Sequence, residues 1–397
     1  QPYQEKKIRD IRRRIRNLPF LQISRDPVVV FTGPRAQTNL FIKKQPASRF
    51  DFVLGLLPQS QDPRDPEQQR LILTGQLEAD LFNALGWGER LTARFEQLQA
   101  GRQELQLGFN LPYPLNLPVG GDFQFELYRR DSTYVDIISR VGVQYLFEGG
   151  NYLQVFWRNI TSNLLSVNEN SIQAARQLPE NLDVRNNQFG LEYFQQQLDY
   201  RFNPRRGWQA QVKASAGSKR IRESTLITEI PEASDGFQPS SLYDSLETRT
   251  FQYRLEGRLE HYVPLFQRST FLTALESGLI FSDSPIFQNE QYRLGGNRLL
   301  RGFDEETLFA TRYAILTLEY RLLIARNSYL FLFTDGAYVE NVTDRRTRYD
   351  TPLGFGSGLS FETKAGIFGL SLAWGRQQSN PIDWAAPRVH FGYLSLF

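Results

Sequence analysis

The side chains best placed for chemistry in this 397-residue chain gather in one short segment, RLGGNRLLRGFDEET, which runs from Arg293 to Thr307. Three arginines and three acids stand there among glycines, and the segment shows no alternation of apolar and polar residues. A guanidinium offers a planar fork of five donors that can bind a carboxylate through two hydrogen bonds at once. Glycine permits the sharp backbone turn that brings such a fork to its partner. The segment therefore suits a loop that an ion pair holds in place.

Catalytic chemistry has few other residues to draw on. The chain has no Cys, and its two histidines, His261 and His390, stand in segments with a strand-like pattern. A Ser-His-Asp relay needs one of these histidines. Neither a G-x-S-x-G turn nor a phosphate-binding glycine loop occurs. The acids at 304–306 lack the spacing of a calcium-binding EF-hand, so we expect a solvated acidic loop there. We expect no enzymatic activity, no cofactor and no bound metal.

The composition favours strands. Aromatic residues make up 13% of the chain, which suits strands better than helices. The formal net charge is only +3, so we expect no nucleic-acid partner. No run of 18 apolar residues exists that could form a transmembrane helix. The mean hydropathy of −0.43 is typical of soluble proteins, but it also suits a membrane barrel whose strands face a polar lumen on one side.

The pattern inside the strands decides between these two classes. In TFQYRLEGRLEHYV, the odd positions from Phe251 to Val263 are mostly apolar and the even positions mostly polar, so the two sets face opposite sides of a strand. Similar segments recur about sixteen times from Ser48 onward, and an even strand number is typical of bacterial barrels. Many span about ten residues, the length of a tilted membrane-crossing strand. The strands of a soluble sandwich or propeller are shorter, and no blade repeat is visible.

The connections support the same class. Short turns alternate along the chain with long polar loops, as in outer-membrane barrels. The long loops cover residues 161–184, 218–246, 282–309 and 341–351. We therefore predict an all-β fold, a transmembrane antiparallel β-barrel of about sixteen strands, over residues 47–397.

The first and last strands must pair to close such a barrel, and we call this joint the seam. The last strand alternates through APRVHFGYLSLF and ends on an aromatic ring, which suits the membrane interface. A glycine inside it weakens pairing, and Pro58 ends the pairing capacity of the first strand. We predict that residues 49–57 pair with residues 389–397. The seam residues are then Phe50, Phe52, Leu54, Phe391, Gly392 and Phe397.

Residues 1–46 follow a different pattern. Ile8, Ile11, Ile15 and Leu18 form one apolar stripe of a basic helix, and two strands follow, joined at Gly33-Pro34. A basic amphipathic helix alone could bind a membrane surface. We prefer a helix that covers a small sheet, as part of an α+β domain that is too short to fold well alone. Because this piece is too short to fold well alone, we expect that more protein once preceded it.

Several motifs resemble the BamA/TamA family of outer-membrane barrels. LLRGF (299–303), between the eleventh and twelfth expected strands, resembles the arginine-glycine-aromatic motif of that family. FLFTDGAYV (331–339) resembles its aromatic-x-Asp-x-Gly strand, although here Ala337 stands where glycine is expected and Gly336 directly follows the acid. GFGSGLSFETKAG resembles the glycine-rich strand before the penultimate turn, and NPRRGW resembles the turn into the ninth strand. The N-terminal helix and strands resemble the end of a POTRA module that lacks its first strand and helix.

The resemblance implies an inward-folded lid at about 282–309. Its tip would carry the lid-loop motif of Leu300, Arg301, Gly302 and Phe303. Its anchor would be the strand motif of Phe333, Asp335 and Gly336. A large loop in a water-filled lumen needs such an anchor, because closure entropy otherwise leaves it mobile. Removing one partner of a shielded Arg301–Asp335 pair would cost about 3–5 kcal/mol, whereas a solvated pair is worth below about 1 kcal/mol.

The resemblance also implies a function. Members of the family insert or translocate other proteins, so we predict an insertase that folds client barrels by strand addition at the seam. The expected partners are unfolded outer-membrane proteins, periplasmic accessory proteins or lipoproteins, and the lipid bilayer. The expected location is the outer membrane of a Gram-negative bacterium, with the N-terminus in the periplasm. Two alternatives stay open: a two-partner-type transporter that passes an unfolded polypeptide through the lumen, and a passive pore or receptor.

Overall fold

The computed structural model describes most of the chain. The described residues are 11, 14–15, 17–33, 35–62, 65–99, 101–114, 117–200, 203–296, 299–343, 347–363, 366–377, 382–385 and 387–396.

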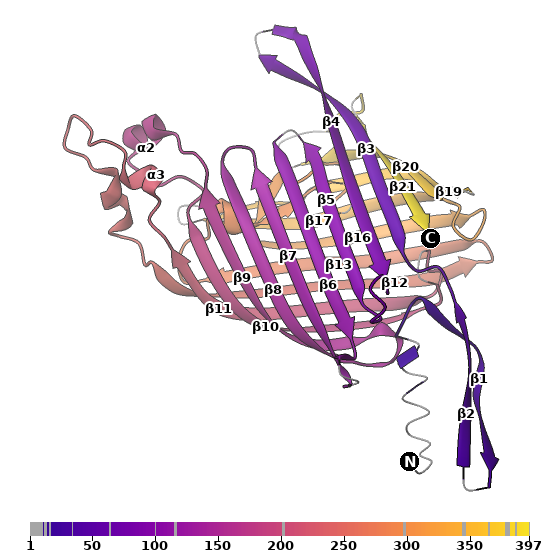
Figure 1. Cartoon of the computed structure of the whole chain (residues 1–397). Helices are drawn as coiled ribbons and strands as arrows, with labels where there is room; N and C mark the ends of the chain where they lie inside the picture. The colour runs from indigo at the N-terminus through magenta and orange to yellow at the C-terminus, as the bar shows by residue number, and fades with distance from the viewer. Residues whose placement is uncertain are drawn as a thin grey trace.

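Strands dominate these residues and close into one antiparallel barrel (Figure 1). Two of the labelled strands, β18 and β19, pair end to end with β17 and form one interrupted strand, so the barrel has sixteen staves, as predicted. The barrel strands are β3 (Arg49–Asp62), β4 (Asp65–Phe82), β5 (Arg90–Gln99), β6 (Arg102–Pro112), β7 (Val119–Arg130), β8 (Tyr134–Leu146), β9 (Tyr152–Leu164), β10 (Val184–Leu198), β11 (Gly207–Ile221), β12 (Arg249–Phe266), β13 (Ser269–Ser282), β16 (Arg312–Leu323), β17 (Tyr329–Val342), β18 (Thr347–Asp350), β19 (Leu353–Glu362), β20 (Ile367–Arg376) and β21 (Arg388–Leu396).

The remaining elements lie in connections or before the barrel. They are the strands β1 (Leu21–Thr32), β2 (Arg35–Lys44), β14 (Tyr292–Leu294) and β15 (Leu308–Ala310), the helices α2 (Glu169–Ala175) and α3 (Thr225–Thr228), and the 3-10 helices η2 (Glu148–Gly150), η3 (Pro239–Tyr243) and η4 (Gln288–Glu290). Within the described residues, no helix is long and apolar enough to cross a membrane.

The wall of the barrel is apolar outside and polar inside. On β12, Phe251, Tyr253 and Leu255 are exposed, whereas Gln252 and Arg254 between them are buried. This is the reverse of a soluble sheet, and it is the arrangement that a strand needs between lipid and an aqueous lumen. The alternation that predicted the barrel therefore predicted the correct faces as well.

The two ends of the barrel differ. One end carries short turns, such as 199–206, 267–268 and 324–328, and lies beside the β1–β2 hairpin (Figure 1). We call it the short-turn end. The other end carries the long loops, with α2 and α3 at its edge (Figure 1). The side chains of these loops form an apolar cluster with the barrel wall at the same end. The cluster includes Tyr128, Leu182 and Ile227, each at most 1% exposed.

The N-terminal strands β1 and β2 form a sheet of their own, separate from the barrel. β1 and β2 pair only with each other among the described residues. Asn17 links this region to the short-turn end, because its Nδ2 donates to the Tyr113 hydroxyl (2.6 Å) and to the Phe147 carbonyl (2.7 Å). Most of the expected helix lies outside the described residues, and its assignment to a POTRA module stays a prediction.

The seam is shorter than predicted. Among the described residues, only four pairs join β21 to β3, from Leu396↔Arg49 to Tyr393↔Phe52, whereas fifteen join β10 to β11. Past Tyr393 and Phe52 the two strands separate. Phe391 and Gly392 pair with β20 but not with β3, and Leu54 pairs with Gly75 of β4.

Of the predicted seam residues, Phe50 and Phe52 therefore lie in the joint, and Phe397 lies outside the described residues. The predicted nine-residue overlap is wrong, because equal strand lengths in a sequence do not set how far two strands stay in register. The ring of Tyr393 lies 4.9 Å from that of Phe52, so side chains supplement the few backbone pairs.

Backbone amides at residues 49–52 and 393–396 should exchange with deuterium about tenfold faster or more than those of β10 and β11, because a four-pair joint opens at lower free energy. Hydrogen exchange with mass spectrometry on the protein in lipid nanodiscs measures this difference. Equal protection of the seam and of the β10–β11 joint would contradict it.

Candidate functional site

The connection between β13 and β16 folds into the lumen, and we call residues 283–311 the lid. Within it, β14 and β15 pair as a small sheet, from Tyr292↔Ala310 to Leu294↔Leu308, so the lid returns on itself and its tip covers residues 295–307. The apolar side of the lid packs against β16 and β17. Its cluster consists of Leu294, Leu300, Phe303, Ala310, Tyr313, Ile315 and Val339. The inward lid implied by the resemblance is present at the predicted place.

Arg301 holds the tip of the lid to the barrel wall. Its Nε and Nη2 donate to the two oxygens of Asp335 at 2.8 and 2.9 Å, and its backbone N–H donates to Asp335 Oδ2 at 3.0 Å. The third arm, Nη1, donates to Glu319 Oε2 at 2.6 Å. The fork therefore binds two carboxylates from neighbouring strands, β17 and β16.

The pair is shielded from water. The side chains of Asp335, Glu319 and Arg301 are 1%, 7% and 14% exposed. The guanidinium lies 3.6 Å from the ring centre of Phe333, and Thr317 donates its hydroxyl to Asp335 Oδ1 at 2.8 Å. Burial alone would lower the pKa of Arg301, but the hydrogen bonds and charges of Asp335 and then Glu319 raise it, so the group stays charged. This geometry selects the shielded alternative considered for the pair.

Glycines on both sides allow the backbones to touch. Gly302 has a φ of +94°, and a Cβ there would lie 2.3 Å from the Trp374 carbonyl oxygen. A Cβ on Gly375 of β20 would lie 2.4 Å from the Gly302 carbonyl oxygen, and one on Gly354 of β19 would lie 1.8 Å from that of Arg301. The tip therefore seats on a strip of bare backbone, and both glycine partners must lack a side chain. Gly336, in contrast, meets only an ordinary contact with Leu353 at 3.8 Å.

The lid also reaches the opposite wall. Arg293 donates from Nη1 to Asp136 Oδ2 at 3.3 Å and lies 3.5 Å from the ring centre of Tyr128. The Tyr128 hydroxyl donates to Glu306 Oε2 at 2.6 Å. Arg102 Nη1 donates to the Glu305 carbonyl at 2.8 Å. The prediction of a solvated acidic loop is therefore wrong for Glu306, because the lumen wall supplies a donor to its carboxylate.

Asp304 connects the lid tip to the last strand. Its Oδ1 lies 2.7 Å from Arg388 Nε, and Arg388 Nη2 donates to Oδ2 at 3.0 Å. Both side chains are more than two-fifths exposed, so this pair contributes little free energy by itself. It does connect the lid directly to β21, one of the two strands that form the seam.

A buried ion pair fixes the start of the lid. Lys219 of β11 is fully buried, and its Nζ donates to Glu290 Oε2 at 2.7 Å and to the Pro285 carbonyl. Gln252 donates to the other oxygen of Glu290 at 3.0 Å. The lid is therefore attached at its start, at its tip and across the lumen.

The sequence motifs identified Arg301 and Asp335 but missed Glu319, Arg293 and Lys219. Glu319 could have been found, because it has the same inward parity as Thr317, the residue that pairs with Asp335 in register. Arg293 and Lys219 gave no such signal, since their partners lie on distant strands. Among the described residues, no three acidic or histidine side chains lie close enough together to hold a metal ion.

The comparisons with known proteins agree with this architecture. The model of the Omp85 superfamily domain matches residues 83–393, from the first short turn to the last strand. The chain belongs to the Omp85 superfamily. It is an outer-membrane β-barrel, and its lid and anchor lie within the matched region.

Solved structures show the same barrel fold. BamA from Haemophilus ducreyi lacking POTRA domains 1-3 matches 100% of this Omp85 chain and 79% of its own, with a TM-score of 0.57 and 13% identity. CdiB from Escherichia coli matches 98% of this chain and 71% of its own, with a TM-score of 0.57 and 15% identity. CdiB from Acinetobacter baumannii matches 96% and 66%, with the same TM-score and 13% identity. In sequence, no protein of curated function matches the chain.

Replacing Arg301 with Ala should lower the free energy of unfolding of this Omp85 barrel by about 3–5 kcal/mol, because it leaves Asp335 buried without its cation, whereas Glu319 keeps its ion pair with Arg321. Arg301→Lys should recover only part of the loss, since an ammonium cannot bind Asp335 through two parallel bonds. Urea unfolding in detergent, followed by the gel shift of the folded barrel, measures both. An Arg301→Ala loss below about 1 kcal/mol would contradict the shielded pair.

Gly375→Ala should displace the lid tip, because its methyl group would lie 2.4 Å from the Gly302 carbonyl oxygen. We expect a loss of about 1–3 kcal/mol and faster proteolytic cleavage between residues 299 and 307. Gly369→Ala is the matched control on the same strand, because a Cβ there meets nothing within 4 Å. If both variants behave alike, the tip does not depend on bare backbone.

Proposed function

We propose that this Omp85 barrel inserts client barrel proteins into the outer membrane by offering the edge of β3 where it separates from β21. The observation that carries the proposal is the four-pair seam, the shortest joint between two of the sixteen staves among the described residues. A client strand can replace four pairs at far lower cost than the fifteen of the β10–β11 joint.

The edge of β3 beyond the seam suits strand addition. From Val53 to Ser60, β3 pairs with β4 alone among the described strands. In hydrocarbon, each unpaired backbone group costs several kcal/mol. A client strand that pairs with this edge avoids that cost while its own barrel forms.

The lid supports a lateral route. A polypeptide that crossed the lumen would have to displace ion pairs on two walls, at Asp335 and at Asp136. A passive pore would need the same space. A client at the seam leaves these pairs in place, and they brace the barrel while the seam opens. The Asp304–Arg388 pair would sense or resist the movement of β21.

The orientation follows from the same proposal. The N-terminal β1–β2 sheet at the short-turn end would lie in the periplasm, where unfolded clients and accessory proteins or lipoproteins arrive. Secretion through the lumen is the second candidate, because the barrel resembles CdiB as closely as it resembles BamA. In that case the lid must leave the lumen.

A disulfide across the seam separates the two functions. Phe50 and Ser395 are direct partners, so Phe50→Cys with Ser395→Cys can form a bridge, and the natural chain has no Cys to compete. Proteoliposomes with the unlocked protein should accelerate the folding of a urea-unfolded eight-stranded client barrel. The oxidised bridge should abolish the acceleration, and reduction should restore it.

The matched control places a bridge in a stable joint, with Gln195→Cys and Ala210→Cys on β10 and β11. It should leave the acceleration unchanged. Full acceleration with the seam locked would refute lateral insertion. A folded protein that never accelerates the client would favour secretion through the lumen.

A further inference from the structure

We propose that the short-turn end of this barrel binds one anionic phospholipid. Its phosphate lies among Arg205, Arg268 and Arg326, and its acyl chain follows an apolar furrow on the lipid-facing wall. The site shares no residue with the lid or the seam.

Three short turns meet at the phosphate site. Asn203 Nδ2 donates to the Arg326 carbonyl at 2.9 Å, and Arg205 Nη2 donates to the Gln267 carbonyl at 2.7 Å. The Leu323 N–H donates to the Arg268 carbonyl at 2.8 Å. These bonds hold residues 199–200, 203–206, 267–268 and 324–328 around a hollow of about 420 Å³, which we call the arginine hollow.

The arginine hollow has an excess of positive charge. Among the described residues that line it are three arginines and one carboxylate, Asp199, whose Oδ1 already accepts the backbone N–H groups of Arg205 (2.9 Å) and Arg206 (3.1 Å). The Arg205 Nε is buried and finds no acceptor within the described part of the chain. The guanidinium carbon of Arg326 lies over the Tyr200 ring, 3.9 Å from its centre, which holds this cation at the hollow. Such forks match the oxygens of a phosphate.

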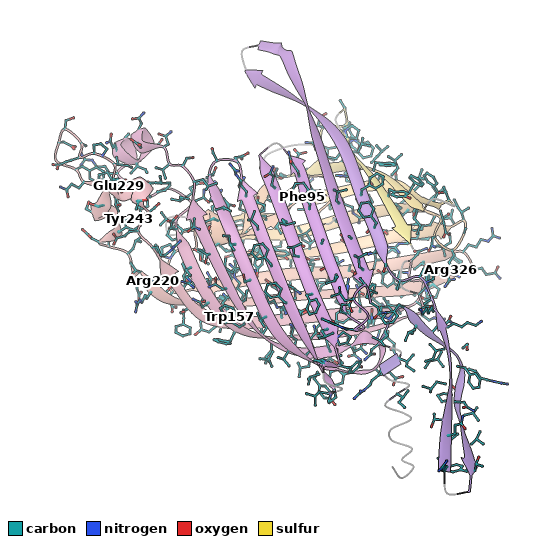
Figure 2. The ribbon with its side chains drawn as sticks, in the orientation of Figure 1. Phe95, Trp157, Arg220, Glu229, Tyr243 and Arg326 are labelled. Carbon is teal, nitrogen blue, oxygen red and sulfur yellow. The ribbon has the colours of Figure 1, made fainter. Side chains whose placement is uncertain are left out.

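The arginine hollow lies at the edge of the apolar wall. Phe266 and Ile324 are 73% and 65% exposed, and each precedes an arginine of the hollow, Arg268 or Arg326, by two residues. Figure 2 shows Arg326 at the end of the barrel remote from Glu229 and Tyr243. An abrupt change from exposed apolar to basic side chains is what a barrel presents at the depth of lipid head groups.

A separate furrow lies on the outer wall close to this edge. It has a volume of about 440 Å³ and runs over β16, β17, β19 and β20. Ser357 forms its floor between the larger side chains of Leu332 and Leu372, its direct partners in register. The furrow begins at Leu322, two residues before Ile324. Its apolar lining includes Leu322, Leu330, Leu332, Leu359, Leu370 and Leu372.

The closeness of the arginine hollow and the furrow along β16 points to a lipid rather than a free anion as the ligand. An arginine cluster alone would bind any soluble phosphate, but an adjoining furrow of exposed leucines offers contact area only to an acyl chain. The class is therefore a phospholipid with a net negative head group. The proposed function places this end in the periplasm, so the ligand would come from the inner leaflet of the outer membrane.

The test measures lipid retention by the full chain without any client. The protein is reconstituted in phosphatidylcholine nanodiscs that contain phosphatidylglycerol, and native mass spectrometry counts the lipids that stay bound on release. We expect one retained phosphatidylglycerol. Arg268→Gln with Arg326→Gln should weaken its retention roughly tenfold or more, because each cation near a lipid surface contributes to anion binding. Ser357→Phe should also weaken it, by filling the furrow without a change in charge.

The matched control is Arg220→Gln with Arg249→Gln, two exposed arginines paired at the other end of the barrel. It removes the same charge and should retain the lipid normally. Soluble glycerol phosphate should not displace the lipid. An equal loss in the control, equal retention of phosphatidylcholine, or displacement by glycerol phosphate would each overturn the proposal. A negative result would leave the seam-locking test intact, because the two experiments share no residue and no readout.

Discussion

Backbone pairing in hydrocarbon is the constraint on which this structure depends. Every N–H and C=O that faces lipid must find a partner, so the sheet has to close on itself. Fifteen pairs secure the β10–β11 joint, but closure itself rests on four pairs between β21 and β3. Aromatic contacts near Tyr393 compensate in part, with rings of Phe52 and Phe368 at 4.9 and 4.8 Å. The barrel is therefore weakest at the seam between its first and last strands. An insertase that works by strand addition needs a joint there that opens easily.

The polar lumen has a different requirement, because each charge that leaves water needs a partner. The lid meets it with a repeated unit, in which an arginine lies over an aromatic ring and binds a carboxylate. Arg301 combines Phe333 with Asp335, and Arg293 combines Tyr128 with Asp136. The two units stand on opposite walls. The lid consequently bridges the lumen and stiffens the barrel across its width. The seam itself still depends on its own four backbone pairs.

The sequence predicted the wall well, because a period of two sets both the strand and its faces. It also predicted the position of the lid and the Arg301–Asp335 pair, since the motifs carry both residues. It did not predict the extent of the seam or the partners of Arg293 and Glu306. Those depend on how far strands diverge and on which distant strand faces a loop across the lumen. Alternation within one strand contains no information about either.

Strand β19, which β20 separates from the seam strand β21, shows what a glycine-rich stave does in this wall. Its inward positions give space to other groups: Gly354 to the Arg301 carbonyl, and Gly356 to the Phe333 ring. A Cβ at Gly356 would lie 2.8 Å from that ring, which is the ring that supports the Arg301 guanidinium. On the outward face of the same strand, Ser357 leaves the furrow that we assign to an acyl chain. Because the side chains of β19 are small, the lid can pack against the wall from the lumen and a lipid can pack against it from outside. The wall at β19 then gains its rigidity from what binds to it, since its own side chains are too small to supply it.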